Sequence, residues 1–174
     1  MKHFIFDLDD TLIVHRNDIN YQWIREDEWL IHYIQHLQDQ GKIYVFTNGT
    51  EKHAKTILDK MNLTQYMSGI YTRDLFGYDN MKPSPISYLI VENQILGINS
   101  SDDIVAQMKA RRGHTMYFFD DRLENLHMAK GRFGWNTIWI HREWDRISEF
   151  PYVDHAYPRI HTALDYLSKG FMRV

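Results

Sequence analysis

The chain has 174 residues, of which 44% are hydrophobic and 25% are charged, with a formal net charge of -3 and no cysteine. This length suits one compact domain, so we expect a single domain over residues 1–174. The charge balance gives no chain-wide reason to bind nucleic acid or an anionic membrane, and the lack of cysteine excludes disulfides, thiolate metal sites and a cysteine nucleophile. The first apolar run is too short for a signal peptide or a membrane span, so we expect a cytoplasmic protein without membrane contact.

Short apolar runs alternate with helical patterns along the chain, which is typical of a parallel sheet with crossover helices. Strands are predicted over residues 3–8, 43–47, 69–72, 116–120 and 137–141. Helices are predicted over about 29–37, 54–61, 85–97, 100–113, 123–129 and 159–169. Gly41 is expected to end the first helix, and Ser100 or Ser101 to open the fourth. We find no repeat and no linker, which favours one α/β domain.

The first polar cluster, DLDDT at residues 7–11, directly follows the first predicted strand. Because ligands of open α/β sheets bind where strands end, this cluster is a candidate site. Residues two apart in an extended chain share a face, so Asp7 and Asp9 can point at one substrate while Leu8 enters the core. One carboxylate can then serve as nucleophile and metal ligand, and the other, held neutral by its neighbours, as acid and base. The alternatives are a solvated acidic turn or a calcium loop, and Thr11 stands where a calcium hand needs an acidic group.

The second cluster, TNGT at residues 47–50, follows the second predicted strand and precedes a helix. A hydroxyl group and free backbone amides at a helix N-terminus form a phosphate cradle. Asn48-Gly49 would instead form a tight hairpin if a strand followed, but a helical pattern follows. The segment therefore predicts phosphate binding by Thr47, Asn48 and Gly49.

Two further clusters carry charge at predicted junctions. Lys82 precedes Ser84 and Pro85, and this segment alone is explained as a well-made helix start. Asp120 and Asp121 end the fourth predicted strand. Asp121 could pair with the glutamate three residues later as a helix cap, whereas Asp120 ends an apolar strand and has no such structural explanation.

The order of the four clusters resembles the haloacid dehalogenase superfamily, in its phosphatase branch. Its first signature, DxDxT, matches the segment 7–11, and its later signatures match Thr47, Lys82 and the pair Asp120 and Asp121. The resemblance spans residues 3 to about 141. The segments KPSPISY and FFDDRLENLHMAKGRFGWNTIWI are most similar to small nucleotidase-like and magnesium-dependent phosphatase members.

The resemblance implies a three-layer α/β/α Rossmann-like fold with a parallel sheet in the order 5-4-1-2-3. It implies a phosphomonoester hydrolase in which Asp7 attacks phosphorus to form an aspartyl-phosphate. Asp9 would protonate the leaving oxygen and then activate water. The residues that the resemblance assigns to Mg²⁺ are Asp7, the Asp9 backbone carbonyl, Asp120 and, directly or through an outer shell, Asp121. Those that it assigns to the phosphoryl group are Thr47, Asn48, Gly49 and Lys82.

Many relatives close the site with an inserted cap domain, but the intervals between the motifs here leave room only for a short flap, about residues 12–24. We therefore expect a minimal or absent cap. Candidate substrate contacts are His15, Arg16 and Asn17 in the flap, and Arg73 and Tyr78 before Lys82.

The expected substrate is a small phosphorylated metabolite or nucleotide, with a second subunit of a homo-oligomer as one means of closing the site. A macromolecular substrate, either a polynucleotide end or a phosphoprotein, is the alternative that an open site allows. The alternative of another class is a non-catalytic binding module on the same fold.

Overall fold

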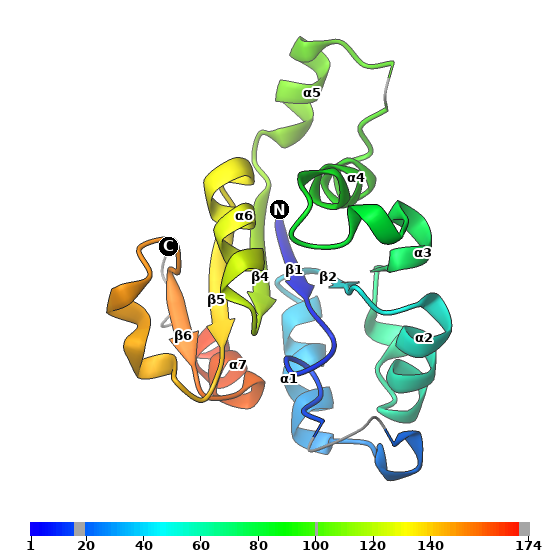
Figure 1. The fold of residues 1–174 in the computed structure, drawn as a ribbon, viewed down its shortest axis with the longest axis vertical. Helices are drawn as coiled ribbons and strands as arrows, with labels where there is room; N and C mark the ends of the chain where they lie inside the picture. The colour runs from blue at the N-terminus through cyan, green and yellow to red at the C-terminus, as the bar shows by residue number, and fades with distance from the viewer. Residues whose placement is uncertain (16–19, 100, 171–174) are drawn as a thin grey trace.

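The fold is seen in a computed structural model that describes residues 1–15, 20–99 and 101–170 (Figure 1). The strands are β1 (Lys2–Phe6), β2 (Gly41–Phe46), β3 (Gly69–Tyr71), β4 (Thr115–Asp120), β5 (Asn136–Ile140) and β6 (His155–Tyr157). The α-helices are α1 (Glu28–Gln38), α2 (Glu51–Lys60), α3 (Arg73–Phe76), α4 (Pro85–Leu96), α5 (Ile104–Arg111), α6 (Leu123–Phe133) and α7 (Ile160–Ser168). Short 3-10 helices are η1 (Tyr21–Trp23), η2 (Thr64–Tyr66), η3 (Tyr78–Asn80) and η4 (Trp144–Glu149).

The strands form one parallel sheet in the order β3-β2-β1-β4-β5-β6. The predicted order 5-4-1-2-3 is therefore present but incomplete, because β6 adds a sixth strand beside β5. β6 is three residues long, and Ala156 is its buried residue. Such a short strand shows no alternation of apolar and polar residues over several positions, which is why the sequence pattern did not reveal it.

Two apolar cores lie on the two faces of the sheet, as expected for a three-layer fold. Successive side chains of a strand point to opposite faces. Phe4 and Phe6 of β1 therefore join one core, while Ile5 between them joins the other. The first core also holds buried residues of α1, α2 and α7, and the second holds those of α3, α4 and α6. The α/β/α arrangement is thus confirmed.

Two predicted helix boundaries are wrong for local reasons. Helix α5 begins after Asp103, whose side chain accepts a hydrogen bond from the Ala106 amide, rather than at Ser100 or Ser101; Ser100 lies outside the described residues. Gly41 starts β2 instead of ending α1, since a Cβ atom there would lie 2.3 Å from the Lys2 carbonyl oxygen. Its role is to allow the close approach of β1.

Helix α5 has no buried residue and stands apart from the three layers in Figure 1. Within the described ranges, no helix is both long enough and apolar enough to cross a membrane.

Candidate active site

The ends of β1, β2 and β4 lie side by side and bring the sequence clusters together. β1 lies between β2 and β4, with Phe6 in register with Val45 on one side and Phe119 on the other. The Asp7 amide continues the ladder by donating to the Phe119 carbonyl oxygen at 2.8 Å. Asp7 therefore emerges beside Asp120, at the carboxyl edge of the sheet where ligands of such folds bind.

The ammonium group of Lys82 is the centre of the cluster. Its Nζ atom donates to Asp7 Oδ1 at 2.8 Å, to Asp120 Oδ2 at 2.7 Å and to the Phe46 carbonyl oxygen at 2.8 Å. The Lys82 side chain is 1% exposed. Burial alone would lower the pKa of Lys82, but the charges of Asp120 and Asp7 raise it, so the amine is held as a cation.

Asp120 is fully buried and is held from the start of α6. Its Oδ1 atom accepts a hydrogen bond from the Arg122 amide at 2.9 Å, and the Asn125 side chain donates to both of its carboxylate oxygens at 3.0 Å. These donors satisfy a carboxylate that has no access to water, and they fix its orientation. The predicted cap of α6 by Asp121 and Glu124 is absent, because Arg122 is the N-cap residue and has no side-chain cap bond.

Asp7, Asp120 and Asp121 form one group whose carboxylate oxygens lie within 4.8 Å of one another. Burial raises the pKa of Asp7 to about 7 against the opposing effect of Lys82. Burial and the charge of Asp120 likewise raise the pKa of Asp121 to about 7. Three carboxyl groups thus lie beside one ammonium group, and a bound cation would favour their ionised forms.

Asp9 lies at the same edge and contacts two histidines that come from different segments. His15 Nε2 lies 2.7 Å from Asp9 Oδ1, and His53 Nε2 lies 2.9 and 3.0 Å from its two oxygens. Tyr21 Oη in turn lies 2.8 Å from His53 Nδ1. Burial alone would raise the pKa of Asp9, but the hydrogen bonds from His53 and His15 lower it. The expectation that its neighbours hold Asp9 neutral is therefore wrong, because these contacts favour the carboxylate.

The second cluster is at the predicted place but has other contacts than expected. The Gly49 amide donates to Thr47 Oγ1 at 3.0 Å, so it is already used within the loop. The Asn48 side chain donates to the Lys82 carbonyl oxygen at 2.9 Å and accepts from the Lys82 amide at 2.8 Å. Asn48 therefore holds the Lys82 segment in place.

Most of these residues line a cavity of about 460 Å³, whereas Asp120, His15 and Tyr21 do not. The residues that line it are Asp7, Asp9, Asp10, Thr47, Asn48, Gly49, Thr50, His53, Arg73, Lys82, Asp121, Arg122 and Asn125. Sequence reasoning missed His53, Arg122 and Asn125. The available signal was their position in or beside the first turn of a helix that begins at the carboxyl edge of the sheet.

The residues predicted to contact the substrate differ in where the structure places them. His15 contacts Asp9, and Arg73 lines the cavity. Tyr78 is 69% exposed, and its ring lies 5.5 Å from the Arg73 guanidinium carbon. Arg16 and Asn17 lie outside the described residues, so their predicted contacts stay predictions.

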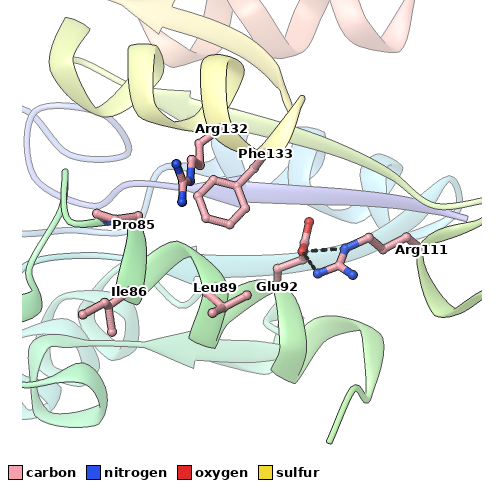
Figure 2. A pocket seen from close by; sticks show the side chains of 7 residues that line it. All are labelled: Pro85, Ile86, Leu89, Glu92, Arg111, Arg132 and Phe133. Carbon is pink, nitrogen blue, oxygen red and sulfur yellow. Dashed lines mark hydrogen bonds and ion pairs between the residues drawn. The ribbon is translucent and has the colours of Figure 1, made fainter. Parts of the chain in front are cut away.

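A second cavity, of about 550 Å³, lies between α4 and α6 and contains none of the predicted site residues (Figure 2). Its walls are mainly apolar, and an ion pair between Glu92 and Arg111 closes one end. Arg132 and Phe133 extend into it from α6 in Figure 2. None of the acidic residues at the strand ends lines this cavity, so we place the candidate site in the first one.

No protein-family model and no curated protein sequence matches the chain. Solved structures do match. A HAD phosphatase from Thermococcus onnurineus superposes with a TM-score of 0.56 at 24% identity, covering 82% of this chain and 56% of that one. A putative HAD-hydrolase from Bacillus subtilis, solved bound to magnesium, gives 0.57 at 15% identity, covering 81% and 55%.

The L-2-haloacid dehalogenase from Xanthobacter autotrophicus gives a TM-score of 0.55 at 15% identity, covering 79% of this chain and 59% of that one. This chain therefore spans little more than half the length of these three proteins. At such identities the likeness establishes a shared fold, while the chemistry has to be argued from the site.

Proposed function

We propose that this chain, which has the fold of the haloacid dehalogenase superfamily, is a magnesium-dependent phosphomonoester hydrolase that works through an aspartyl-phosphate. The observation that carries the proposal is the position of Lys82 Nζ between Asp7 and Asp120, at hydrogen-bond distance from both carboxylates. This contact joins three of the four sequence clusters, and it places a buried cation beside a carboxylate suited to attack phosphorus.

The donor set suits a divalent cation with a preference for oxygen. Asp7, Asp120 and Asp121 supply the carboxylates, and the backbone carbonyl of Asp9 is the further ligand that we assign. Burial, together with the charge of Asp120, raises the pKa of Asp7 and of Asp121 despite the opposing effect of Lys82. When bound, Mg²⁺ would neutralise this charge and that of the substrate's phosphate.

Asp7 is the residue to which we assign nucleophilic attack. One of its carboxylate oxygens forms a bond to phosphorus while the bond from phosphorus to the ester oxygen breaks. Lys82 keeps the carboxylate in place and offsets charge on the phosphoryl oxygens, and Thr47 with the Asn48 amide faces the same group. Water then attacks phosphorus, which restores the Asp7 carboxylate and releases inorganic phosphate.

Asp9 is the residue to which we assign proton transfer in both steps. Its hydrogen bonds with His53 and His15 favour the carboxylate, which is the form that takes a proton from water in the second step. A phosphate dianion entering the cavity brings like charge, which raises the pKa of Asp9 and favours the acid needed for the leaving oxygen. This residue is our reason for proposing phosphoester hydrolysis over dehalogenation, although dehalogenases share the fold.

The size of the cavity favours a small phosphorylated metabolite or nucleotide as the substrate, since about 460 Å³ is within the usual range for small-molecule sites. We keep a polynucleotide end or a phosphoprotein as the alternative substrate.

The test is release of phosphate from an aryl phosphate by the wild type and by Asp7→Asn, each with MgCl₂ and with EDTA. We expect turnover that requires Mg²⁺ and that falls at least a thousandfold in Asp7→Asn. The matched control is Asp39→Asn, a change at an exposed carboxylate after α1, which should keep full activity. Chloride release from a 2-haloacid without phosphate release would overturn the proposal in favour of dehalogenation.

A further inference from the structure

Arg73 is a cation of the cavity that the proposed chemistry does not use. It begins α3, and its backbone amide donates to the Gly49 carbonyl oxygen at 3.0 Å, which fixes it beside the loop 47–50. Its side chain is partly buried and lines the cavity. Its guanidinium group lies over the Tyr78 ring at 5.5 Å, a contact that limits the rotamers it can adopt.

The other cations of the cavity already have carboxylate partners. Lys82 is bound by Asp7 and Asp120, and Arg122 is paired with Glu124. Arg73 has no ion pair with any carboxylate in the part of the chain that the structure describes. Among the described residues its guanidinium group is thus left without a carboxylate partner, in a cavity that also holds Asp7, Asp9, Asp10 and Asp121.

The phosphoryl group that reacts must lie against Asp7 and Lys82, at the ends of β1 and β2. Arg73 is held at the loop 47–50 by its backbone bond to the Gly49 carbonyl oxygen, and neither of the hydrogen bonds of Lys82 to the carboxylates involves it. The cavity is several times larger than one phosphate group and extends to both places. A second part of the substrate can therefore reach Arg73 while its ester phosphate is at Asp7.

We propose that the substrate is a small phosphomonoester carrying a second anionic group, either phosphate or carboxylate, and that Arg73 binds this second group. The inference rests on the proposed hydrolase function and adds the class of substrate to it. A guanidinium group presents two parallel N–H donors that match the oxygens of a carboxylate or phosphate, which a lysine cannot do. The contact with the Tyr78 ring restricts the Arg73 side chain before binding, so less rotamer entropy is lost when the anion binds.

The test compares substrates that differ only in the second anion. Adenosine 3',5'-bisphosphate is compared with adenosine 3'-monophosphate and 5'-monophosphate, and 3-carboxyphenyl phosphate is compared with phenyl phosphate. We expect kcat/KM of the wild type to be at least tenfold higher for the doubly anionic member of a set. The set of nucleotides tests for binding of a second phosphate, and the set of aryl phosphates tests for binding of a carboxylate.

Variants of Arg73 then test whether this side chain causes the preference for doubly anionic substrates. Arg73→Gln should raise KM at least tenfold for the preferred substrate, with kcat and all parameters for phenyl phosphate within about threefold of the wild type. Arg73→Lys should restore part of the loss, because it keeps the charge but not the paired donors. Arg132→Gln is the matched control, since this exposed arginine lines the other cavity (Figure 2).

Two outcomes separate this inference from the function on which it rests. The assignment of Arg73 is wrong if the wild type hydrolyses phenyl phosphate but shows no preference in either set, or if Arg73→Gln keeps the preference. Either result would leave the proposed hydrolase function unaffected. If no phosphomonoester is hydrolysed in the presence of MgCl₂, the hydrolase function itself is wrong.

Discussion

Lys82 Nζ lies 2.8 Å from Asp7 Oδ1, although 75 residues separate the two in the sequence. The same atom lies 2.7 Å from Asp120 Oδ2. The lysine therefore pairs with two carboxylates at the ends of β1 and β4, and both the stability of the fold and the proposed chemistry depend on these contacts.

We predict that Lys82→Met destabilises the protein as well as abolishing its activity. The substitution keeps most of the side-chain volume but leaves Asp7 and Asp120 buried without their cation. Breaking a buried pair in this way costs about 3 to 5 kcal/mol of the free energy of unfolding. Urea unfolding in EDTA measures the loss, and Lys60→Met, an exposed change at the end of α2, should lose less than about 0.5 kcal/mol. A loss below about 1 kcal/mol in Lys82→Met would show that the two carboxylates do not need the lysine.

We predict that magnesium stabilises the folded chain, independently of any activity. A ligand that binds only the folded state at a hundred times its Kd adds about 2.7 kcal/mol to the free energy of unfolding. Urea unfolding at increasing MgCl₂ concentration should show this gain, and EDTA should reverse it.

Asp121→Asn tests which residues hold the ion. It replaces a partly buried carboxylate by an amide of the same shape, so the gain with MgCl₂ should require at least tenfold more of the salt. Asp39→Asn again serves as control and should respond as the wild type does. An unchanged response of Asp121→Asn would remove that residue from the metal site.

We predict that His53 acts on catalysis through Asp9. His53 is a positioning residue, because its Nε2 atom contacts both oxygens of Asp9 and so fixes the direction in which this carboxyl group delivers a proton. A proton on the leaving oxygen matters more for an alkoxide than for an acidic phenol. His53→Ala should therefore reduce kcat about a hundredfold for alkyl phosphates and less than tenfold for an aryl phosphate. Tyr21→Phe, which removes the hydroxyl group 2.8 Å from His53 Nδ1, should show a smaller effect of the same kind.

Gly49 gives an independent check on this role. A Cβ atom at Gly49 would lie 2.6 Å from His53 Cδ2, so Gly49→Ala must displace the ring from Asp9. It should reproduce the dependence on leaving group seen in His53→Ala. Gly131→Ala is the matched control, because its Cβ atom would meet nothing within 4 Å. Equal losses for alkyl and aryl phosphates would show that His53 does not act on protonation of the leaving oxygen.

The sequence predicted the core sheet and the motif residues because both leave local patterns. Apolar runs mark the strands, and DxDxT marks the place where the first of them ends. The supporting contacts leave no such pattern: Asn48 holds the Lys82 backbone and Asn125 holds Asp120 through side chains that meet only after folding. The ionisation of Asp9 was predicted wrongly for the same reason, since His53 lies 44 residues away.

We predict, finally, that His3 makes the stability depend on pH. His3 is 1% exposed in β1, and its Nε2 atom lies 2.7 Å from His114 Nδ1. Burial and the neighbouring positive charge lower the pKa of His3 from 6.5 to about 4. Between these two values the unfolded chain binds a proton that the folded chain does not. The free energy of unfolding should therefore fall as the pH drops from about 7 to 4, by at most about 3 kcal/mol at about 1.4 kcal/mol per pKa unit.

Urea unfolding of the wild type and of His3→Gln between pH 7 and 4 measures how much His3 contributes to the pH dependence of the free energy of unfolding. Glutamine can replace the hydrogen bond with His114 but cannot titrate, so the difference in stability between the two proteins should move in favour of His3→Gln as the pH falls. His36→Gln, a change at an exposed histidine of α1, is the matched control. A constant difference between wild type and His3→Gln from pH 7 to 4 would mean that the fold accepts the charged imidazole. The contact between His3 and His114 would then have to admit water while the sheet stays intact.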